Sequence, residues 1–240
     1  NPMFLLPSAL LSHAEDIGAG WAASLTMGAG QFCTNPGIAV VQAGADADRF
    51  IKAAVDALEQ AAAQTMLTDG IASAYRSGRD RIRVAKGVQE ILTSTCDLRN
   101  ATPYLFQATA REWLENDVLA EEVFGPLGMI VVAETTDEVI QVAKSLKGQL
   151  TCTLHLEAGD TEEAAKLVPI LERKAGRVLA NGYPTGVEVS DTMVHGGPYP
   201  ASTNFGATSV GTMSIRRFLR PVCYQNIPAE LMPQDLQKDI

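Results

Sequence analysis

Cys33, a cysteine set between glycines, is the residue of this sequence best placed to act as a nucleophile. It lies in the run Gly28-Ala29-Gly30-Gln31-Phe32-Cys33-Thr34-Asn35-Pro36-Gly37. Because glycines adopt positive φ and allow close backbone approach, they can present a thiol on a sharp turn between two regular elements. A thiol attacks as the thiolate, and exposed backbone N–H groups at such a turn lower its pKa. Isolated cysteines are more often inert core residues, but the glycine-rich setting favours a reactive role for Cys33.

Two later segments carry side chains that could work with this thiol. The run Glu122-Val123-Phe124-Gly125-Pro126 begins 89 residues after Cys33, and His195 stands in a glycine-rich stretch 162 residues after it. A lone histidine in such a stretch is more often structural than catalytic. His195 is nevertheless the one candidate base for Cys33, and a cysteine hydrolase would require these two side chains to meet.

These segments resemble the signatures of a known enzyme family. Gly30-Gln31-Phe32-Cys33-Thr34 resembles the catalytic cysteine motif of the aldehyde dehydrogenase superfamily, and the run from Glu122 to Pro126 resembles its second signature, Glu-x-Phe-Gly-Pro. The segments from His195 to Ala201 and from Arg217 to Asn226 resemble a narrower branch. That branch includes 2,5-dioxovalerate (α-ketoglutaric semialdehyde) dehydrogenases and an NADP-dependent fatty-aldehyde dehydrogenase. The resemblance extends over the whole chain, although members of the family are considerably longer.

The resemblance implies roles for four residues in oxidising an aldehyde with NAD or NADP. Cys33 would form a thiohemiacetal and then a thioester, with its backbone N–H as one oxyanion donor. Glu122 would bind the nicotinamide ribose hydroxyls, Phe124 would pack near the cofactor, and His195 would tune the thiol or move a proton. The family's general base, its second oxyanion donor and its cofactor-binding domain fall before Asn1, so we expect the isolated chain to be inactive and to bind the cofactor weakly.

The identity of the aldehyde stays open at this stage. The branch favours a semialdehyde such as 2,5-dioxovalerate, which would be oxidised to 2-oxoglutarate. Long-chain aliphatic aldehydes are the alternative substrate class. A chain that acts only as a non-enzymatic folding or oligomerisation module is the alternative function.

Composition narrows the choice of partners and compartment. The formal net charge of −9 disfavours nucleic acid and anionic membranes, which require clustered Lys and Arg. The four cysteines are widely spaced and form no Cys-x-x-Cys pair, so we expect neither a metal site nor a disulfide framework. Reduced thiols favour a cytoplasmic protein. No apolar run is long enough for a membrane span, and the first residues do not resemble a signal peptide.

Hydrophobic periodicity predicts an α/β fold, with an open, mostly parallel twisted sheet and helices on both faces. From residue 128 to residue 180 strands and helices alternate as βαβαβ, with helix starts at Thr135-x-x-Glu138 and Asp160-x-x-Glu163. The charges at Arg79, Asp80, Arg81 and Arg83 are interpreted as a solvated helix face. In the first half we expect strands at 3–6 and 38–41, and helices at 13–28, 46–64 (with Asp46 or Asp48 as N-cap) and 72–92.

The last quarter of the chain has a different character. Residues 182–212 form a long Gly- and Pro-rich loop whose aromatic residues indicate packing. Residues 214–226 are predicted to be an exposed edge strand, which in the resembled family joins another subunit. We therefore expect a catalytic domain over 1–213, an oligomerisation strand and tail over 214–240, and a homo-oligomer.

Overall fold

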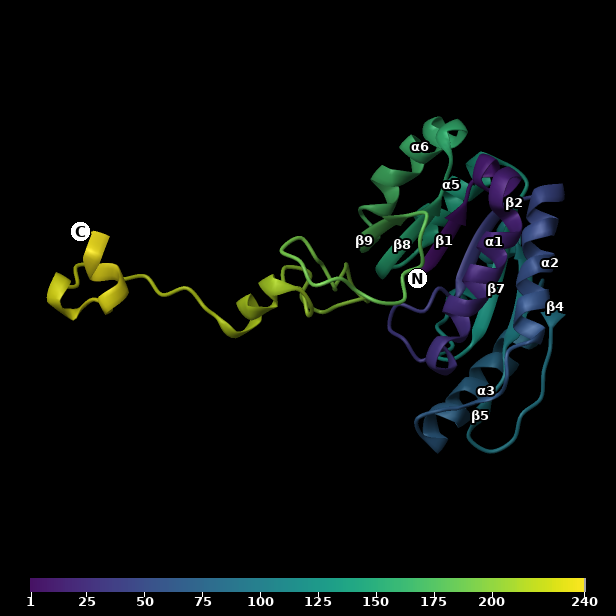
Figure 1. The fold of residues 1–240 in the computed structure, drawn as a ribbon, viewed down its shortest axis with the longest axis horizontal. Helices are drawn as coiled ribbons and strands as arrows, with labels where there is room; N and C mark the ends of the chain where they lie inside the picture. Colours follow the sequence, from purple (N-terminus) through teal and green to yellow (C-terminus); the bar gives the residue numbers. More distant parts are fainter. Residues whose placement is uncertain (240) are drawn as a thin grey trace.

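A seven-stranded sheet forms the centre of the molecule in the computed structural model, which describes residues 1–239 (Figure 1). Every neighbouring pair of strands is parallel except the antiparallel pair at one edge, β4 and β6. The predicted open, mostly parallel sheet is therefore confirmed. The strands are β1 (Pro2–Leu5), β2 (Ile38–Gln42), β4 (Gln89–Leu92), β6 (Tyr104–Thr109), β7 (Leu127–Ala133), β8 (Gln149–His155) and β9 (Ala175–Ala180), in the spatial order β4-β6-β7-β2-β1-β8-β9. Separately, β3 (Gln64–Thr65) and β5 (Asn100–Ala101) form a short antiparallel pair.

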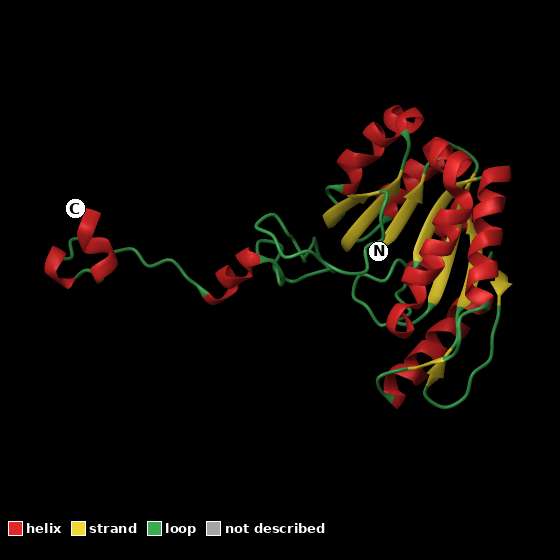
Figure 2. Cartoon of the chain, in the orientation of Figure 1, coloured by secondary structure: helices red, strands yellow, loops and turns green. Residues whose placement is uncertain are grey.

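Helices cover both faces of this sheet, as predicted (Figure 2). Because successive strand side chains point to opposite faces, Met3 and Leu5 enter one apolar layer and Phe4 enters the other. The layer of Met3 and Leu5 is completed by α1 (Pro7–Thr26) and α2 (Ala45–Glu59). The layer of Phe4 is completed by α3 (Asp69–Arg83), α4 (Ala110–Glu115), α5 (Thr136–Ser145) and α6 (Thr161–Leu171).

The helix α1 fixes the sheet to the segment that carries Cys33. Trp21 of α1 is fully buried and packs against Phe50 of α2, with ring centroids 5.6 Å apart. An aromatic pair of this kind contributes about 0.5–1.5 kcal/mol beyond its buried area. Trp21 Nε1 also donates a hydrogen bond of 2.6 Å to the carbonyl of Pro36. One side chain therefore joins the helical layer to the end of the cysteine loop.

Two helix starts differ from the prediction. The helix α1 begins at Pro7, where proline suits the first turn, and not near His13, which instead has non-helical angles (φ −139°, ψ 24°) within it. The N-cap of α2 is Gly44. Asp46 and Asp48 lie in the first turn of α2, where negative charge interacts favourably with the helix dipole.

The helix predicted over 72–92 is wrong in its second half. The helix α3 ends at Arg83, and residues 89–92 form β4, which pairs with β6. The helix has already ended four residues before Gly87, whose left-handed φ of 84° is incompatible with a helix, and a Cβ added at Gly87 would lie 2.5 Å from the Glu112 side chain. The helix therefore cannot continue, and the chain turns back to the sheet edge.

The C-terminal segment leaves the sheet as an arm, defined here as residues 212–239 (Figure 1). Residues 212–218 form the 3₁₀ helix η4 (Thr212–Phe218), in which no residue is buried, and residues 219–227 have no regular structure. The predicted strand over 214–226 is therefore wrong for the single chain. A strand needs adjacent backbone partners, and the arm extends beyond the reach of the sheet.

Across residues 1–239, each helix is too short or too polar to cross a membrane.

Candidate active site

The loop that carries Cys33 begins with three consecutive left-handed residues. The 3₁₀ helix η1 (Met27–Gly30) follows α1, and Gly28, Ala29 and Gly30 have φ of 56°, 58° and 68°. For Ala29, which has a Cβ, this conformation costs about 1–2 kcal/mol. The Ala29 N–H donates to Gln64 Oε1 at 2.9 Å, and Gln64 Nε2 donates to the carbonyl of Thr26 at 2.8 Å. The Gln64 amide therefore offsets part of the strain and fixes the turn that leads to Cys33.

Cys33 is exposed at the end of this turn. Asn35 Nδ2 donates to the carbonyl of Leu25 at 2.8 Å, which ties the far side of the loop to α1. Among the residues that the structure describes, the Cys33 N–H has no protein acceptor. It can therefore act as a donor to an oxyanion formed on carbon bonded to Cys33 Sγ.

The two segments singled out in the sequence meet through a pair of glycines. A Cβ on Gly30 would lie 2.3 Å from the carbonyl carbon of Gly125, a separation that real Cβ atoms do not reach. Only glycine permits this approach of the two backbones. The cysteine loop and the Glu122 segment are consequently packed directly against each other.

Cys33, Glu122 and Phe124 line one cavity of about 750 Å³. The cavity also reaches Ile38 and Gln149, the first residues of β2 and β8. Ligands of open α/β sheets usually bind at the carboxyl ends of the strands, whereas this cavity lies at the amino ends. Sequence reasoning identified these three of the lining residues but not their place at this edge of the sheet.

The segment from Glu122 to Pro126 rests on α3 through Tyr75. A Cβ on Gly125 would lie 2.3 Å from Tyr75 Cδ2, so the tyrosine ring packs flush on this backbone. The Tyr75 hydroxyl donates to the carbonyl of Thr102 at 2.8 Å. Burial raises the pKa of Tyr75, so the phenol stays protonated and remains a donor. This support could not be found from sequence because Tyr75 lies in no recognisable motif.

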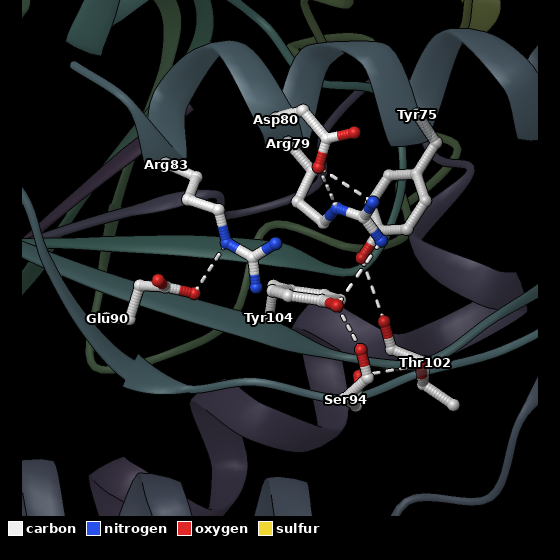
Figure 3. A network of polar contacts seen from close by, with 8 residues as sticks. All are labelled: Tyr75, Arg79, Asp80, Arg83, Glu90, Ser94, Thr102 and Tyr104. Atoms are coloured by element: carbon white, nitrogen blue, oxygen red, sulfur yellow. Dashed lines mark hydrogen bonds and ion pairs between the residues drawn. The ribbon is translucent and has the colours of Figure 1, made fainter.

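Arginines of the same helix make further polar contacts in the neighbourhood of Tyr75 (Figure 3). Arg79 lies over the Tyr104 ring, 4.8 Å from its centroid, and pairs with Asp80 at 2.7 Å. Arg83 pairs with Glu90 of β4 at 2.8 Å. Only 14% of the Arg79 side chain is exposed, so the predicted solvated face is wrong for this residue.

His195 contacts Cys33. Its Nε2 lies 3.4 Å from Cys33 Sγ, which is within hydrogen-bond reach for sulfur. The His195 N–H donates to Thr208 Oγ1 at 2.8 Å, and the His195 carbonyl accepts from the Ser209 N–H at 3.1 Å. The turn that carries the imidazole is thus braced from within the loop.

The loop reaches Cys33 because it packs closely on the sheet edge. A Cβ on Gly176 of β9 would lie 2.3 Å from the carbonyl oxygen of Gly196, the residue after His195. Because Gly176 has no Cβ, the loop can lie directly on β9. The aromatic residues of this loop are split: Tyr183 contacts the carbonyl of Ile17 at 3.2 Å, whereas Tyr199 and Phe205 are exposed.

Arg177 of β9 is a member of the site that sequence reasoning missed. Its two Nη atoms donate to the carbonyls of Pro184 and Gly186 at 2.7 and 2.9 Å, and its buried Nε has no partner within residues 1–239. Burial, and secondarily the Arg177 cation, lowers the pKa of His195. The imidazole beside Cys33 is therefore held toward its neutral form, in which it can accept a proton.

Among the described residues, Cys33 is the one cysteine that lines this cavity. All four thiols are free. Burial raises the pKa of Cys152 to about 12, so that thiol is inert at neutral pH. Within the described residues, His, Cys, Asp and Glu side chains form no group of three that could hold a metal ion.

A sequence model of the aldehyde dehydrogenase family matches residues 1–220. The chain therefore belongs to the aldehyde dehydrogenase family, which confirms the resemblance carried by the Cys33 and Glu122 segments.

Two curated relatives are both named as alpha-ketoglutaric semialdehyde dehydrogenases. The chain is 49% identical to alpha-ketoglutaric semialdehyde dehydrogenase 2 of Azospirillum brasilense, in an alignment covering 99% of this chain and 46% of the relative. It is 42% identical to alpha-ketoglutaric semialdehyde dehydrogenase of Acinetobacter baylyi, covering 100% of this chain and 46% of the relative. The chain thus spans about half the length of the curated relatives that it matches.

Solved structures support the fold. Glyceraldehyde-3-phosphate dehydrogenase GapN from Methanocaldococcus jannaschii, solved in complex with NADP, superposes with a TM-score of 0.65 at 21% identity. The match covers 82% of this chain and 42% of that one. At this identity the comparison establishes the architecture alone.

Proposed function

We propose that this chain supplies the reactive cysteine and part of the nicotinamide-binding wall of an NAD(P)-dependent aldehyde dehydrogenase that oxidises a semialdehyde. The observation that carries the proposal is that Cys33 and Glu122, from two distant segments, line one cavity of about 750 Å³. The names of the two relatives support 2,5-dioxovalerate (α-ketoglutaric semialdehyde) as the substrate and 2-oxoglutarate as the product.

Cys33 would act through its thiolate. Sγ adds to the aldehyde carbon, the carbonyl π pair moves onto oxygen, and the backbone N–H of Cys33 stabilises the resulting oxyanion. Hydride then leaves that carbon, and the carbonyl re-forms as a thioester. Water adds to the thioester and passes its two protons to solvent, the C–S bond breaks, and the carboxylate leaves as Cys33 returns to its thiolate.

His195 would accept the proton that leaves the Cys33 thiol. Its Nε2 lies 3.4 Å from Cys33 Sγ, and its lowered pKa keeps the ring neutral and able to accept that proton. The geometry does not provide an orienting carboxylate for His195, because within residues 1–239 the hydrogen bond of its ring is to Cys33 and not to Asp or Glu. We therefore assign His195 to activation of the thiol.

The cavity wall fits the nicotinamide end of the cofactor. Glu122 is an exposed carboxylate that can accept hydrogen bonds from two hydroxyls, and Phe124, 38% exposed, lines the same cavity. A bound nicotinamide supplies the acceptor for the hydride. NAD and NADP both remain candidates.

The arm (residues 212–239) would join the protein to another copy of itself. Its exposed large apolar side chains are Ile215, Phe218, Leu219, Val222, Tyr224, Ile227, Leu231 and Leu236. Apolar area of this extent on an extended segment favours association. Two exposed free thiols, Cys33 and Cys223, support a reducing, cytoplasmic setting.

Expression of the complete reading frame that encodes this chain would test the proposed activity. The enzyme should reduce NAD⁺ or NADP⁺ with 2,5-dioxovalerate at a kcat/KM well above that for a long-chain aliphatic aldehyde, and Cys33→Ala should abolish the reaction. Equal or better use of the aliphatic aldehyde would overturn the substrate assignment.

The contact of Cys33 with His195 favours a second candidate, ester hydrolysis by the chain itself. Attack on an activated ester such as p-nitrophenyl acetate requires a thiolate and an oxyanion donor but no cofactor. Intact-mass analysis should reveal an acetyl group on Cys33. A single burst of p-nitrophenol would indicate the acylation half-reaction alone, whereas steady turnover that is lost in His195→Ala would indicate a hydrolase.

A further inference from the structure

Asn1 joins the cysteine loop to the sheet through both ends of its side-chain amide. Nδ2 donates to the carbonyl of Cys33 at 2.8 Å and to that of Asn35 at 3.2 Å. Oδ1 accepts from the N–H and the Oγ1 of Thr151 at 3.0 and 3.2 Å. All four contacts are to residues at least 32 positions away in the sequence.

The position of Asn1 follows from the order of the strands. Asn1 directly precedes β1, which lies between β2 and β8 and pairs Pro2 with Ile38 and Met3 with Thr153. The side chain therefore spans from the loop that enters β2 to the first half of β8. Thr151 is only 1% exposed, so one end of the bridge is anchored in the core.

We propose that Asn1 is a positioning residue for Cys33, one that holds the thiol at the place where it meets His195. The bond from Nδ2 fixes the carbonyl of Cys33, so it restrains the peptide unit between Cys33 and Thr34 and hence the Cα from which the side chain that carries Sγ extends. The neighbouring bond to Asn35 fixes the exit of the loop. Within residues 1–239 the Cys33 carbonyl accepts no other hydrogen bond, so loss of the amide would remove its one hydrogen-bond restraint.

The importance of this role for catalysis rests on the proposed function, so the test uses a reaction that needs neither aldehyde nor cofactor. The rate of Cys33 alkylation by iodoacetamide would be measured from pH 5.5 to 9 in the 240-residue chain, by mass spectrometry of the Cys33 peptide. Asn1→Leu removes all four hydrogen bonds with nearly the same side-chain volume. Thr151→Val removes only the Oγ1 contact. Asn204→Leu, in an exposed turn, is the matched control.

We expect Asn1→Leu to slow alkylation at pH 7 at least fivefold and to give the pH profile of the His195→Ala variant. Thr151→Val should lie between Asn1→Leu and the parent chain, and Asn204→Leu should match the parent. In the double variant Asn1→Leu/His195→Ala the alkylation rate should fall no further than in the single variant with the larger effect, because both changes break the same contact. Thermal unfolding identifies any variant that does not fold, in which case Thr151→Val carries the test.

Two results would overturn the proposal. The first is that Asn1→Leu is alkylated within twofold of the parent rate across the pH range and only its melting temperature is lower. Asn1 would then have a structural role alone. The second is that the fold-decrease in alkylation rate of the double variant equals the product of the fold-decreases of the two single variants. Neither result bears on whether the complete enzyme oxidises a semialdehyde, which the substrate assay decides by itself.

Discussion

Gly30 of the cysteine loop and Gly125 of the Glu122 segment lie in backbone contact: a Cβ added to Gly30 would stand 2.3 Å from the carbonyl carbon of Gly125. The two segments that carry the reactive groups are therefore positioned against each other rather than independently. A displacement of either backbone moves the thiol relative to the Glu122 carboxylate.

Gly30→Ala should consequently damage both stability and the site. The added Cβ meets backbone atoms, which cannot rotate away as a side chain can, so we expect a loss of roughly 1–3 kcal/mol in the free energy of unfolding. Urea denaturation would measure it. Gly186→Ala is the control, because Gly186 also has positive φ (107°) but has open space around it. An equal or larger loss in Gly186→Ala would show that backbone strain, and not the contact with Gly125, is the cause.

Cys33 should be the first thiol alkylated at neutral pH. It is exposed beside His195, whereas Cys152 is buried with a pKa raised to about 12. Brief treatment with iodoacetamide followed by peptide mass spectrometry would rank the four thiols. Cys223 is the informative comparison because it is exposed as well; faster labelling there would contradict the assignment of Cys33 as the activated thiol.

Replacement of Arg177 by glutamine should raise the pKa of His195. The Arg177 cation opposes protonation of the imidazole, second in effect to burial, so its removal lets His195 bind a proton at higher pH. Less neutral imidazole is then present near pH 6 in the variant than in the parent chain. NMR titration of the three histidines would measure the shift. Arg177→Lys, which keeps the charge, should leave the pKa of His195 low; a rise in both variants would contradict the electrostatic explanation.

His155 should make stability fall with acidification. Burial lowers its pKa from 6.5 to about 4, so between these pH values the unfolded chain binds a proton that the folded chain does not. The contribution is complete above the unfolded pKa and is lost as pH falls, by about 1.4 kcal/mol between pH 7.5 and 5.5. His155→Gln, which can still donate to the Gly182 carbonyl, should lack this slope in urea titrations, and the exposed-site control His13→Gln should keep it. Identical slopes in the parent chain and His155→Gln would exclude His155 as the source.

The 240-residue chain alone should not reduce NAD⁺ or NADP⁺ with any aldehyde. Glu122 and Phe124 offer few contacts, which do not offset the rotational and translational freedom that a cofactor loses on binding. A fluorimetric assay with 2,5-dioxovalerate would check this. Robust formation of NADH or NADPH by the isolated chain would contradict it.

Much of the sheet was predictable because local signals agreed with tertiary packing. The helix after Thr135 is a clear case: Thr135 accepts a hydrogen bond from the Glu138 N–H at 3.3 Å, as its sequence pattern indicates. The region around β4 and β6 could not be predicted, because β4 is half exposed and Gly87 interrupts a sequence pattern that otherwise looks helical. The predicted strand in the arm was wrong for a different reason. Residues that favour extended structure form a strand only where a partner strand is present.

The residues of the candidate site also divide into those that the sequence predicts and those that only the structure identifies. Cys33, Glu122 and Phe124 stand in recognisable motifs, and each lines the cavity. Asn1 and Arg177 act through contacts with residues that are distant in sequence, or with backbone carbonyls of a loop, and no local pattern encodes such contacts. Their identification required the register of β1 with its two neighbours and the path of the loop over β9.

The central place of β1 also has a consequence for synthesis of the protein. Met3 pairs with Ala39 on one side, but its partner on the other side is Thr153. A ribosome adding about 5–20 residues per second needs on the order of ten seconds to pass from the end of β2 to the end of β8. Throughout that interval one edge of β1 is open, with apolar side chains on both faces, and can pair with strands of other nascent chains. We therefore expect elongation speed and chaperone supply, more than the stability of the finished fold, to determine the yield of native protein in a cell.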